Sequence, residues 1–171
     1  HIDAIRNNDI VILAIPHAAY ESFVTEYAIG LQGKILVDIS NPVTPGLYSC
    51  MGSIIGRSCG GGEDRITGKI SSAQYIQAQL CSLGANGVHI VKAFNAISAY
   101  ELEHMAARLP PPIVTVSGDN EGAKLQVMNL ARRMGYSALD FGGIEDSIIQ
   151  ERTVHRFFDG WVSAVIVRAV V

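Results

Sequence analysis

The sequence predicts an α/β fold with a Rossmann-like, doubly wound and mainly parallel sheet that is incomplete at the N-terminus. Two observations support this prediction. Short apolar runs rich in β-branched residues alternate with stretches of helical periodicity, which is the order of strands and helices in a doubly wound sheet. Hydrophobic residues make up 49% of the 171 residues and charged residues only 17%, as expected when strands are buried on both faces.

Central strands are predicted where apolar residues run together without clean alternation, because both faces of such strands are covered. A weaker run at 137–142 (SALDFG) predicts a further strand near the end of the pattern. The four stronger runs are 10–15 (IVILAI), 35–39 (ILVDI), 88–94 (VHIVKAF) and 113–118 (IVTVSG).

Helices are predicted between these strands. Residues 70–84 and 121–135 carry apolar side chains at helical spacing, and a glycine lies at the end of each stretch. Either Asp119 or Asn120 can cap the start of the second helix. Two less regular helices are predicted at 17–30 and 97–108.

We predict one domain over residues 1–153, followed at 154–171 by a linker that leads into a first transmembrane helix. The end of the chain is almost wholly apolar, and a final core helix is the alternative interpretation. The segment 43–68 is long, glycine-rich and without periodicity, so we interpret it as an excursion from the sheet. Because the chain opens at His1 in what resembles the middle of a fold, we expect a fragment.

Composition excludes several classes of protein and site. The net charge of −3 argues against a nucleic-acid surface. The three cysteines lack C-x-x-C spacing, which fits neither a disulfide framework nor a zinc site, and a reducing, cytosol-facing environment is the natural interpretation. The histidines have no metal-ligand spacing, and no Ser-His-Asp or Cys-His arrangement is apparent. We therefore predict no metal site and no catalytic side chain.

A ligand site is predicted at the carboxyl ends of the strands, where open parallel sheets bind ligands. Serine and asparagine side chains there can bond ribose hydroxyls or a carboxamide. The same residue types are ordinary in turns, so each loop alone has two interpretations. Four such loops at one edge favour a crevice. The residues are Pro16, His17, Ala18, Ser40, Asn41, Pro42, Phe94, Asn95, Ala96, Gly118 and Asp119.

Two charged residues lie within the predicted strands. For Asp38 we favour a structural anchor over a catalytic acid. Lys92 is either a charge partner for a phosphate or carboxylate, or an ordinary cation at a strand end. The glycine-rich run at 60–62 follows no strand and opens no helix, so it does not qualify as a dinucleotide-binding loop. A Rossmann domain with this sequence would lack its first βαβ unit.

Several motifs carry a family resemblance. The segments 34–42 (KILVDISNP), 71–80 (SSAQYIQAQL), 89–102 (HIVKAFNAISAYEL) and 116–144 resemble the NADP oxidoreductase domain shared by coenzyme-F420-dependent NADP reductases and STEAP metalloreductases, with the STEAP branch the better match. The segment 154–167 (VHRFFDGWVSAVIV) is similar to the linker that precedes the first membrane helix of STEAP proteins.

The resemblance implies an enzyme domain that binds NADPH and passes hydride to a flavin, FAD. In STEAP proteins, haem in a membrane domain then carries electrons to Fe(III) or Cu(II). The domain would face the cytosol, at an endosomal or plasma membrane, with the flavin and its own membrane domain as partners. Assembly into a homo-oligomer is left open. The alternatives are a soluble F420-type NADP reductase or imino-acid reductase, and a degenerate, non-catalytic Rossmann binding module.

The resemblance also implies site residues. The segment 14–20 (AIPHAAY) resembles the loop along the cofactor, which assigns Ala14, Ile15, Pro16, His17 and Tyr20 to it. Asn41 would contact the nicotinamide half, with Ser40 and Asn95 beside it.

Three further positions bear on the flavin end of the site. Ala99 matches an alanine near the nicotinamide, and Tyr100 stands where the family has a flavin-stacking tryptophan. Arg108 departs from the pattern, since an acidic flavin contact is expected there. Because the phosphate loop is absent, we expect the fragment alone to bind dinucleotide poorly.

Overall fold

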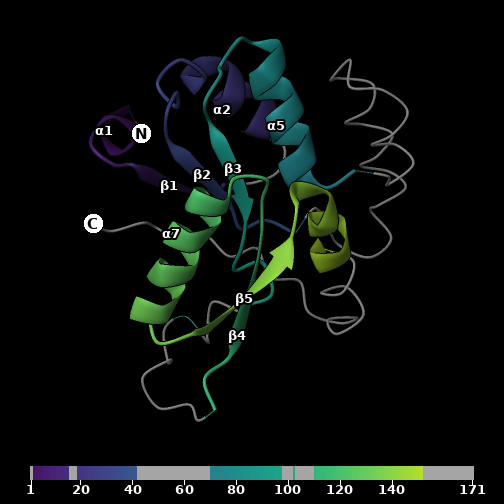
Figure 1. The fold of residues 1–171 in the computed structure, drawn as a ribbon. Coiled ribbons are helices and arrows are strands. Elements are labelled where there is room, and N and C mark those ends of the chain that lie inside the picture. The colour runs from purple at the N-terminus through teal and green to yellow at the C-terminus, as the bar shows by residue number, and fades with distance from the viewer. Residues whose placement is uncertain (1, 16–18, 42–69, 98–101, 103–109, 152–171) are drawn as a thin grey trace.

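The computed structural model of the chain describes residues 2–15, 19–41, 70–97, 102 and 110–151. Within these ranges it contains one five-stranded sheet in the order β1-β2-β3-β4-β5 (Figure 1). All five predicted strands are confirmed, each within the run that predicted it. They are β1 (Ile10–Leu13), β2 (Ile35–Asp38), β3 (His89–Lys92), β4 (Ile113–Ser117) and β5 (Ser137–Gly142).

The sheet is mainly parallel, as predicted. β1 pairs with β2, β2 with β3 and β4 with β5 in parallel, whereas β3 and β4 form a single antiparallel pair, Lys92 with Ser117. Lys92 ends β3 and Ser117 ends β4, so the antiparallel pair joins two carboxyl ends. The carboxyl ends of β2, β3 and β4 therefore meet in one place.

In the described ranges three longer helices cover the sheet, and their positions agree with the predicted stretches. A short helix, α1, and the 3-10 turn η3 were not predicted. Of the less regular helix predicted at 97–108, only residues 97 and 102 lie in the described ranges. The elements are α1 (Ile2–Arg6), α2 (Tyr20–Tyr27), α5 (Ser72–Ser82), α7 (Glu121–Arg133) and η3 (Ile144–Asp146).

Side-chain caps define where α5 and α7, the two longest of the described helices, begin. Asn120 caps α7, because its side-chain oxygen accepts a hydrogen bond of 2.8 Å from the backbone N–H of Ala123. α5 begins with a capping box, in which Ser71 Oγ accepts from Gln74 N and Gln74 Oε1 accepts from Ser71 N.

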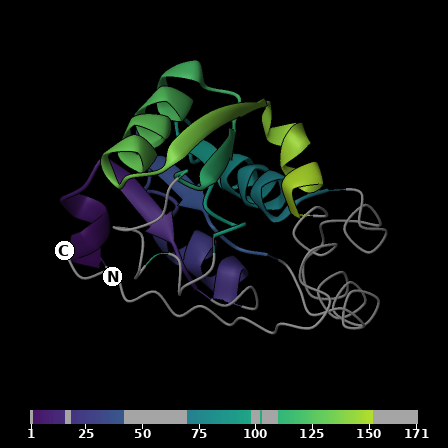
Figure 2. The same ribbon diagram turned by 90° about the horizontal axis from the view of Figure 1, so that it is seen from below.

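Helices lie on both faces of the sheet, which makes it doubly wound (Figure 2). Because successive strand residues point to opposite faces, Leu36 and Ile90 enter one core and Val37 and Val91 enter the other. The first core is completed by α2 and α5, and the second by α7. Alternation also sends Asp38 and Lys92 to the face of Leu36 and Ile90, beneath α2 and α5.

Several predictions concern residues outside the described ranges. These are the domain limit at 153, the linker at 154–171 and the excursion at 43–68, together with the predicted cofactor residues Pro16, His17, Ala99 and Tyr100. Among the helices that the structure does describe, none combines the length and the apolar character needed to cross a bilayer.

Gly142 has a backbone conformation that an L side chain rarely adopts. Its φ is +107°, and its partner in β4, Ser117, lies at a register shift. A Cβ at this position would overlap the carboxylate of Asp146, which accepts a hydrogen bond from the N–H of Gly143 at 3.0 Å. The turn from β5 into η3 therefore requires glycine.

We expect Gly142→Ala to lower the free energy of unfolding by about 1–3 kcal/mol, because it strains the backbone and displaces Asp146. Urea unfolding followed by circular dichroism measures the change. Gly30→Ala is the control, since its φ lies outside the left-handed region and its Cβ would make only ordinary contacts at 3.5 Å. Equal stability of the two variants would contradict the assigned role of Gly142.

Candidate functional site

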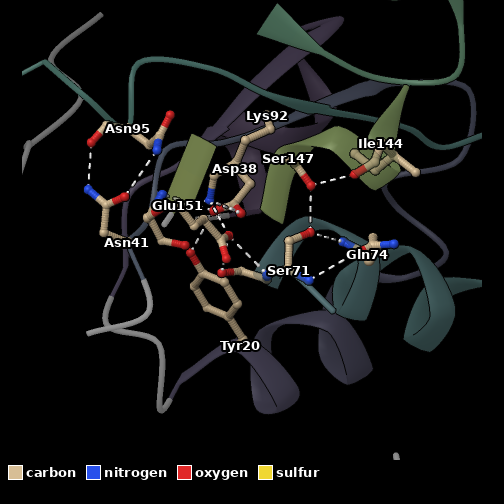
Figure 3. A network of polar contacts seen from close by, with 12 residues as sticks. Tyr20, Asp38, Asn41, Ser71, Gln74, Lys92, Asn95, Ile144, Ser147 and Glu151 are labelled. Atoms are coloured by element: carbon tan, nitrogen blue, oxygen red, sulfur yellow. Dashed lines mark hydrogen bonds and ion pairs between the residues drawn. The ribbon is translucent and has the colours of Figure 1, made fainter. Parts of the chain in front are cut away.

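A buried ion pair joins the carboxyl ends of β2 and β3. Asp38 and Lys92 are register partners in adjacent parallel strands, so both side chains point to the same face. Lys92 Nζ lies 2.8 Å from Asp38 Oδ2, and both side chains are 0% exposed (Figure 3). The two residues that the sequence analysis singled out inside strands are therefore partners.

Glu151 completes the charge cluster from a distant part of the chain. Its Oε1 accepts from Lys92 Nζ at 2.7 Å, from the Ser72 hydroxyl at 2.7 Å and from the Ser72 backbone N–H at 3.0 Å. Ser72 is the first residue of α5, and the amino end of a helix favours a carboxylate. The ammonium also donates to the carbonyl of Ser40, so its three N–H groups all have acceptors.

Asp38 is bonded through both carboxylate oxygens. Oδ2 accepts from Lys92, while Oδ1 accepts from the Tyr20 hydroxyl at 2.9 Å and from Ser40 N at 3.0 Å. This arrangement agrees with the interpretation of Asp38 as a structural anchor. Tyr20 is 1% exposed, so its hydroxyl serves this network. Its predicted contact with a cofactor stays a prediction.

In this cluster the attraction between opposite charges outweighs desolvation in setting the pKa values of Asp38 and Lys92. Burial acts to raise the pKa of Asp38, but the Lys92 ammonium and the Ser40 N–H hold that pKa below its usual value. Burial acts to lower the pKa of Lys92, but Asp38 and Glu151 hold it above its usual value. Burial and then the charge of Asp38 raise the pKa of Tyr20, so its hydroxyl stays protonated and donates.

Two asparagines face each other at the same edge of the sheet. Asn95 Nδ2 donates to Asn41 Oδ1 at 3.1 Å, and Asn41 Nδ2 donates to the carbonyl of Asn95 (Figure 3). The turn after β3 passes through Phe94, whose φ of +59° is rare for a residue with a side chain. Phe94 is held by edge-to-face packing on Tyr136, with ring centroids 6.0 Å apart.

One hydrogen-bond acceptor of this asparagine pair has no donor among the described residues. Asn95 is 5% exposed, and its Oδ1 is buried without a hydrogen-bond partner among the described residues. An unsatisfied buried acceptor costs free energy, so native structures keep few of them. At this edge of the sheet, Asn95 Oδ1 is suited to accept a hydrogen bond from a ligand amide.

The structure brings together part of the predicted site. Ser40, Asn41 and Asn95 converge at the carboxyl ends of β2 and β3, and the half-buried Ala14 and Ile15 follow the carboxyl end of β1. Tyr20 lies in the Asp38 network instead, and the other predicted cofactor residues, Pro16, His17, Ala99 and Tyr100, lie outside the described ranges, so their positions remain predictions.

Two further residues of the predicted edge have structural roles. A Cβ at Gly118 would lie 3.0 Å from the carbonyl of Ile90, so glycine lets β4 approach β3. Asp119 accepts hydrogen bonds from the backbone of Ile144 at 2.9 Å and from Gln77 at 3.1 Å. Both interactions hold neighbouring elements together.

Sequence reasoning missed Glu151 and the serines near it. Glu151 follows a stretch without periodicity, and no local signal marks it as a partner of Lys92. The start of α5 did carry a signal, because Ser71 and Gln74 form the S-x-x-Q pattern of a capping box. Ser71 Oγ also bonds to Ser147 Oγ, which in turn donates to the carbonyl of Ile144.

An open sheet with helices on both faces and polar side chains at its carboxyl ends defines a Rossmann-like α/β domain. The chain is similar to known oxidoreductases. The family model described as NADP oxidoreductase, coenzyme F420-dependent, matches residues 1–42. Metalloreductase STEAP3 of Rattus norvegicus is 28% identical over 93% of the chain, and metalloreductase STEAP2 of Mus musculus is 29% identical over 98%.

Solved structures show the same fold. A putative F420-dependent NADP-reductase from Arthrobacter sp. FB24 superimposes with a TM-score of 0.67 at 24% identity, covering 92% of this chain and 67% of that one. A hypothetical protein from Sinorhizobium meliloti gives 0.62 at 26% identity, covering 85% of this chain and 61% of that one. The predicted resemblance and fold class are confirmed. The chain spans only 28% and 29% of the length of these two metalloreductases.

We expect Lys92→Met to lower the free energy of unfolding by about 3–5 kcal/mol, because it leaves two buried carboxylates without their cation. Lys124→Met is the matched control. The Lys124 side chain is also nearly buried, at 5% exposed, but its partners Glu121 and Asp140 are 81% and 45% exposed. We expect that control to lose less than about 1 kcal/mol. Similar losses of stability in the two variants would contradict the role of Lys92 as the cation that neutralises the buried carboxylates.

The cluster also predicts how stability depends on pH. The contribution of Asp38 is full above the pKa of an unfolded aspartate, about 4, and is lost as the pH falls through its lowered folded value. The contribution of Lys92 is full below the pKa of an unfolded lysine, about 10.4, and is lost as the pH rises through its raised folded value.

Urea unfolding at a series of pH values tests this dependence. We expect Asp38→Asn to be less stable than wild type at neutral pH and to lose less stability in acid, because the titrating carboxylate is gone. An acid decline as steep in the variant as in wild type would assign that decline to other groups.

Proposed function

We propose that the chain binds NADPH at the carboxyl ends of its strands and donates hydride from it to a flavin, as the NADPH-binding domain of a STEAP-like metalloreductase. The observation that carries the proposal is the Asn41–Asn95 pair, which leaves a buried acceptor at the edge where such sheets bind ligands. The similarity to metalloreductases over 93% and 98% of the chain supports it.

The asparagine pair fits the carboxamide of a nicotinamide. That group carries an NH₂ donor, and Asn95 Oδ1 is a buried acceptor that has no donor within the part of the chain that the structure describes. A ligand that donates to this oxygen removes the cost of burying it unpaired. Ser40 and Asn41 border the same position through their hydrogen bonds to Lys92 and Asn95.

Bound NADPH would supply the hydride, and the side chains of the site would hold the ring in place. Among the described residues, Lys92 and Asp38 are not free to act as acid or base, because the N–H groups of Lys92 all have acceptors and Asp38 accepts three hydrogen bonds. Orientation is then the main contribution of the protein, as in other reactions whose chemistry resides in the cofactor.

The flavin, the haem, the metal acceptors and the cytosol-facing membrane placement are proposed from the resemblance. Because the chain spans less than a third of the relatives' length, the activity of a whole metalloreductase is a proposal for this chain. A soluble F420-type reductase is the second candidate, favoured by the family model that matches residues 1–42. Oxidation of NADPH with FAD or with coenzyme F420 as the acceptor distinguishes the two.

We expect NADPH to bind the full-length wild-type protein saturably in isothermal titration calorimetry, since the fragment alone is expected to bind dinucleotide poorly. Asn95→Ala removes the acceptor and the partner of Asn41, so we expect its affinity for NADPH to fall by about ten-fold, as for one lost hydrogen bond of about 1.4 kcal/mol. Asn86→Ala is the control, because Asn86 is exposed and precedes β3 at the opposite end of the strand. If Asn95→Ala binds NADPH as tightly as wild type, the site is not at this pair.

A further inference from the structure

The hydrogen bonds of Lys92 lead directly to the asparagine pair. Its side chain is 0% exposed and all three donors have protein acceptors, so Lys92 cannot itself contact a ligand. One of these acceptors is the carbonyl of Ser40, the residue just before Asn41. Any effect of Lys92 on a ligand must therefore pass through its neighbours.

Ser40 is held from both sides of its backbone. Its N–H donates to Asp38 Oδ1 at 3.0 Å, and its carbonyl accepts from Lys92 Nζ. Asp38 and Lys92 are also bonded to each other, so the three hydrogen bonds close a ring that includes the backbone of Ser40. With both peptide groups of Ser40 fixed, the backbone of Asn41 starts from a defined position.

The other asparagine is tied to Lys92 through the chain. Asn95 lies three positions after Lys92, beyond the left-handed turn at Phe94. Its side chain then bonds to Asn41 at 3.1 Å, so the two branches from Lys92 meet again. Lys92 is therefore connected to both members of the pair, to Asn41 through Ser40 and to Asn95 along the chain.

We propose that Lys92 is a positioning residue, which orients Asn41 and Asn95 for the carboxamide of the bound cofactor. This inference rests on the proposed function. An ammonium suits the role because it is a compact charge that donates to three converging oxygens, whereas a guanidinium is a wide planar fork. The cluster then has a positioning function in addition to its contribution to stability. A comparison of two ligands can distinguish the two roles.

The two ligands are NADPH and 2′-phospho-ADP-ribose, which is the oxidised cofactor without its nicotinamide. The ratio of the dissociation constant for 2′-phospho-ADP-ribose to the dissociation constant for NADPH measures what the nicotinamide half adds to affinity. A positioning role changes this ratio, whereas a purely structural role weakens both ligands alike.

The variant is the triple exchange Asp38→Asn, Lys92→Met and Glu151→Gln, which removes the ammonium without leaving buried charges unpaired. We expect the ratio to fall about ten-fold while the affinity for 2′-phospho-ADP-ribose stays unchanged. Lys34→Met is the control, since Lys34 bonds to the carbonyl of Asn8 near the amino ends of β1 and β2, away from the asparagine pair. We expect it to leave the ratio unchanged.

A ratio that the triple variant preserves would overturn the positioning role and leave NADPH binding intact. Full-length wild-type protein that binds neither ligand would overturn the proposed function, and the inference with it, by a distinct result. Should the triple variant not fold, Lys92→Arg replaces it. We then expect the ratio to fall several-fold, and an unchanged ratio would overturn the role.

Discussion

The structure depends on one buried ammonium, that of Lys92. Taking a charge out of water is costly, and a buried ion pair is tolerated only when its remaining hydrogen bonds are satisfied. Here Lys92 meets two carboxylates and one carbonyl, and Asp38 and Glu151 use their oxygens to hold α2 and α5. The same bonds that satisfy the charge thus join the sheet to two of its helices.

This constraint explains why the candidate site contains few groups able to react. The charged side chains at the carboxyl ends of β2 and β3 are committed to each other, and the neutral amides of Asn41 and Asn95 lie at the position suited to a ligand. Such an arrangement favours holding a reactive cofactor over supplying an acid or base. The buried charges of Asp38 and Lys92 contribute stability, and the neutral amides of Asn41 and Asn95 are available for recognition of a ligand.

Much of the fold could be predicted from sequence because its signals are local. Runs such as 35–38 are rich in β-branched residues, and Asn120 is a strong cap. Pairing of Asp38 with Lys92 depends on strand register, and Glu151 reaches them only through the tertiary fold. The left-handed turn at Phe94 was equally hidden, since phenylalanine is an unusual residue there and packing on Tyr136 holds it.

The long reach of Glu151 bears on how the chain can be divided. Residues 38, 92 and 151 belong to segments that a chimera between relatives would readily separate, yet none of the three charges is tolerable alone in the interior. A fragment cut after β3, or a graft that exchanges 110–151 without an acidic residue at 151, would leave the ammonium short of an acceptor. Residues 38, 92 and 151 are therefore energetically coupled, and a recombinant chain would have to take all three from the same parent.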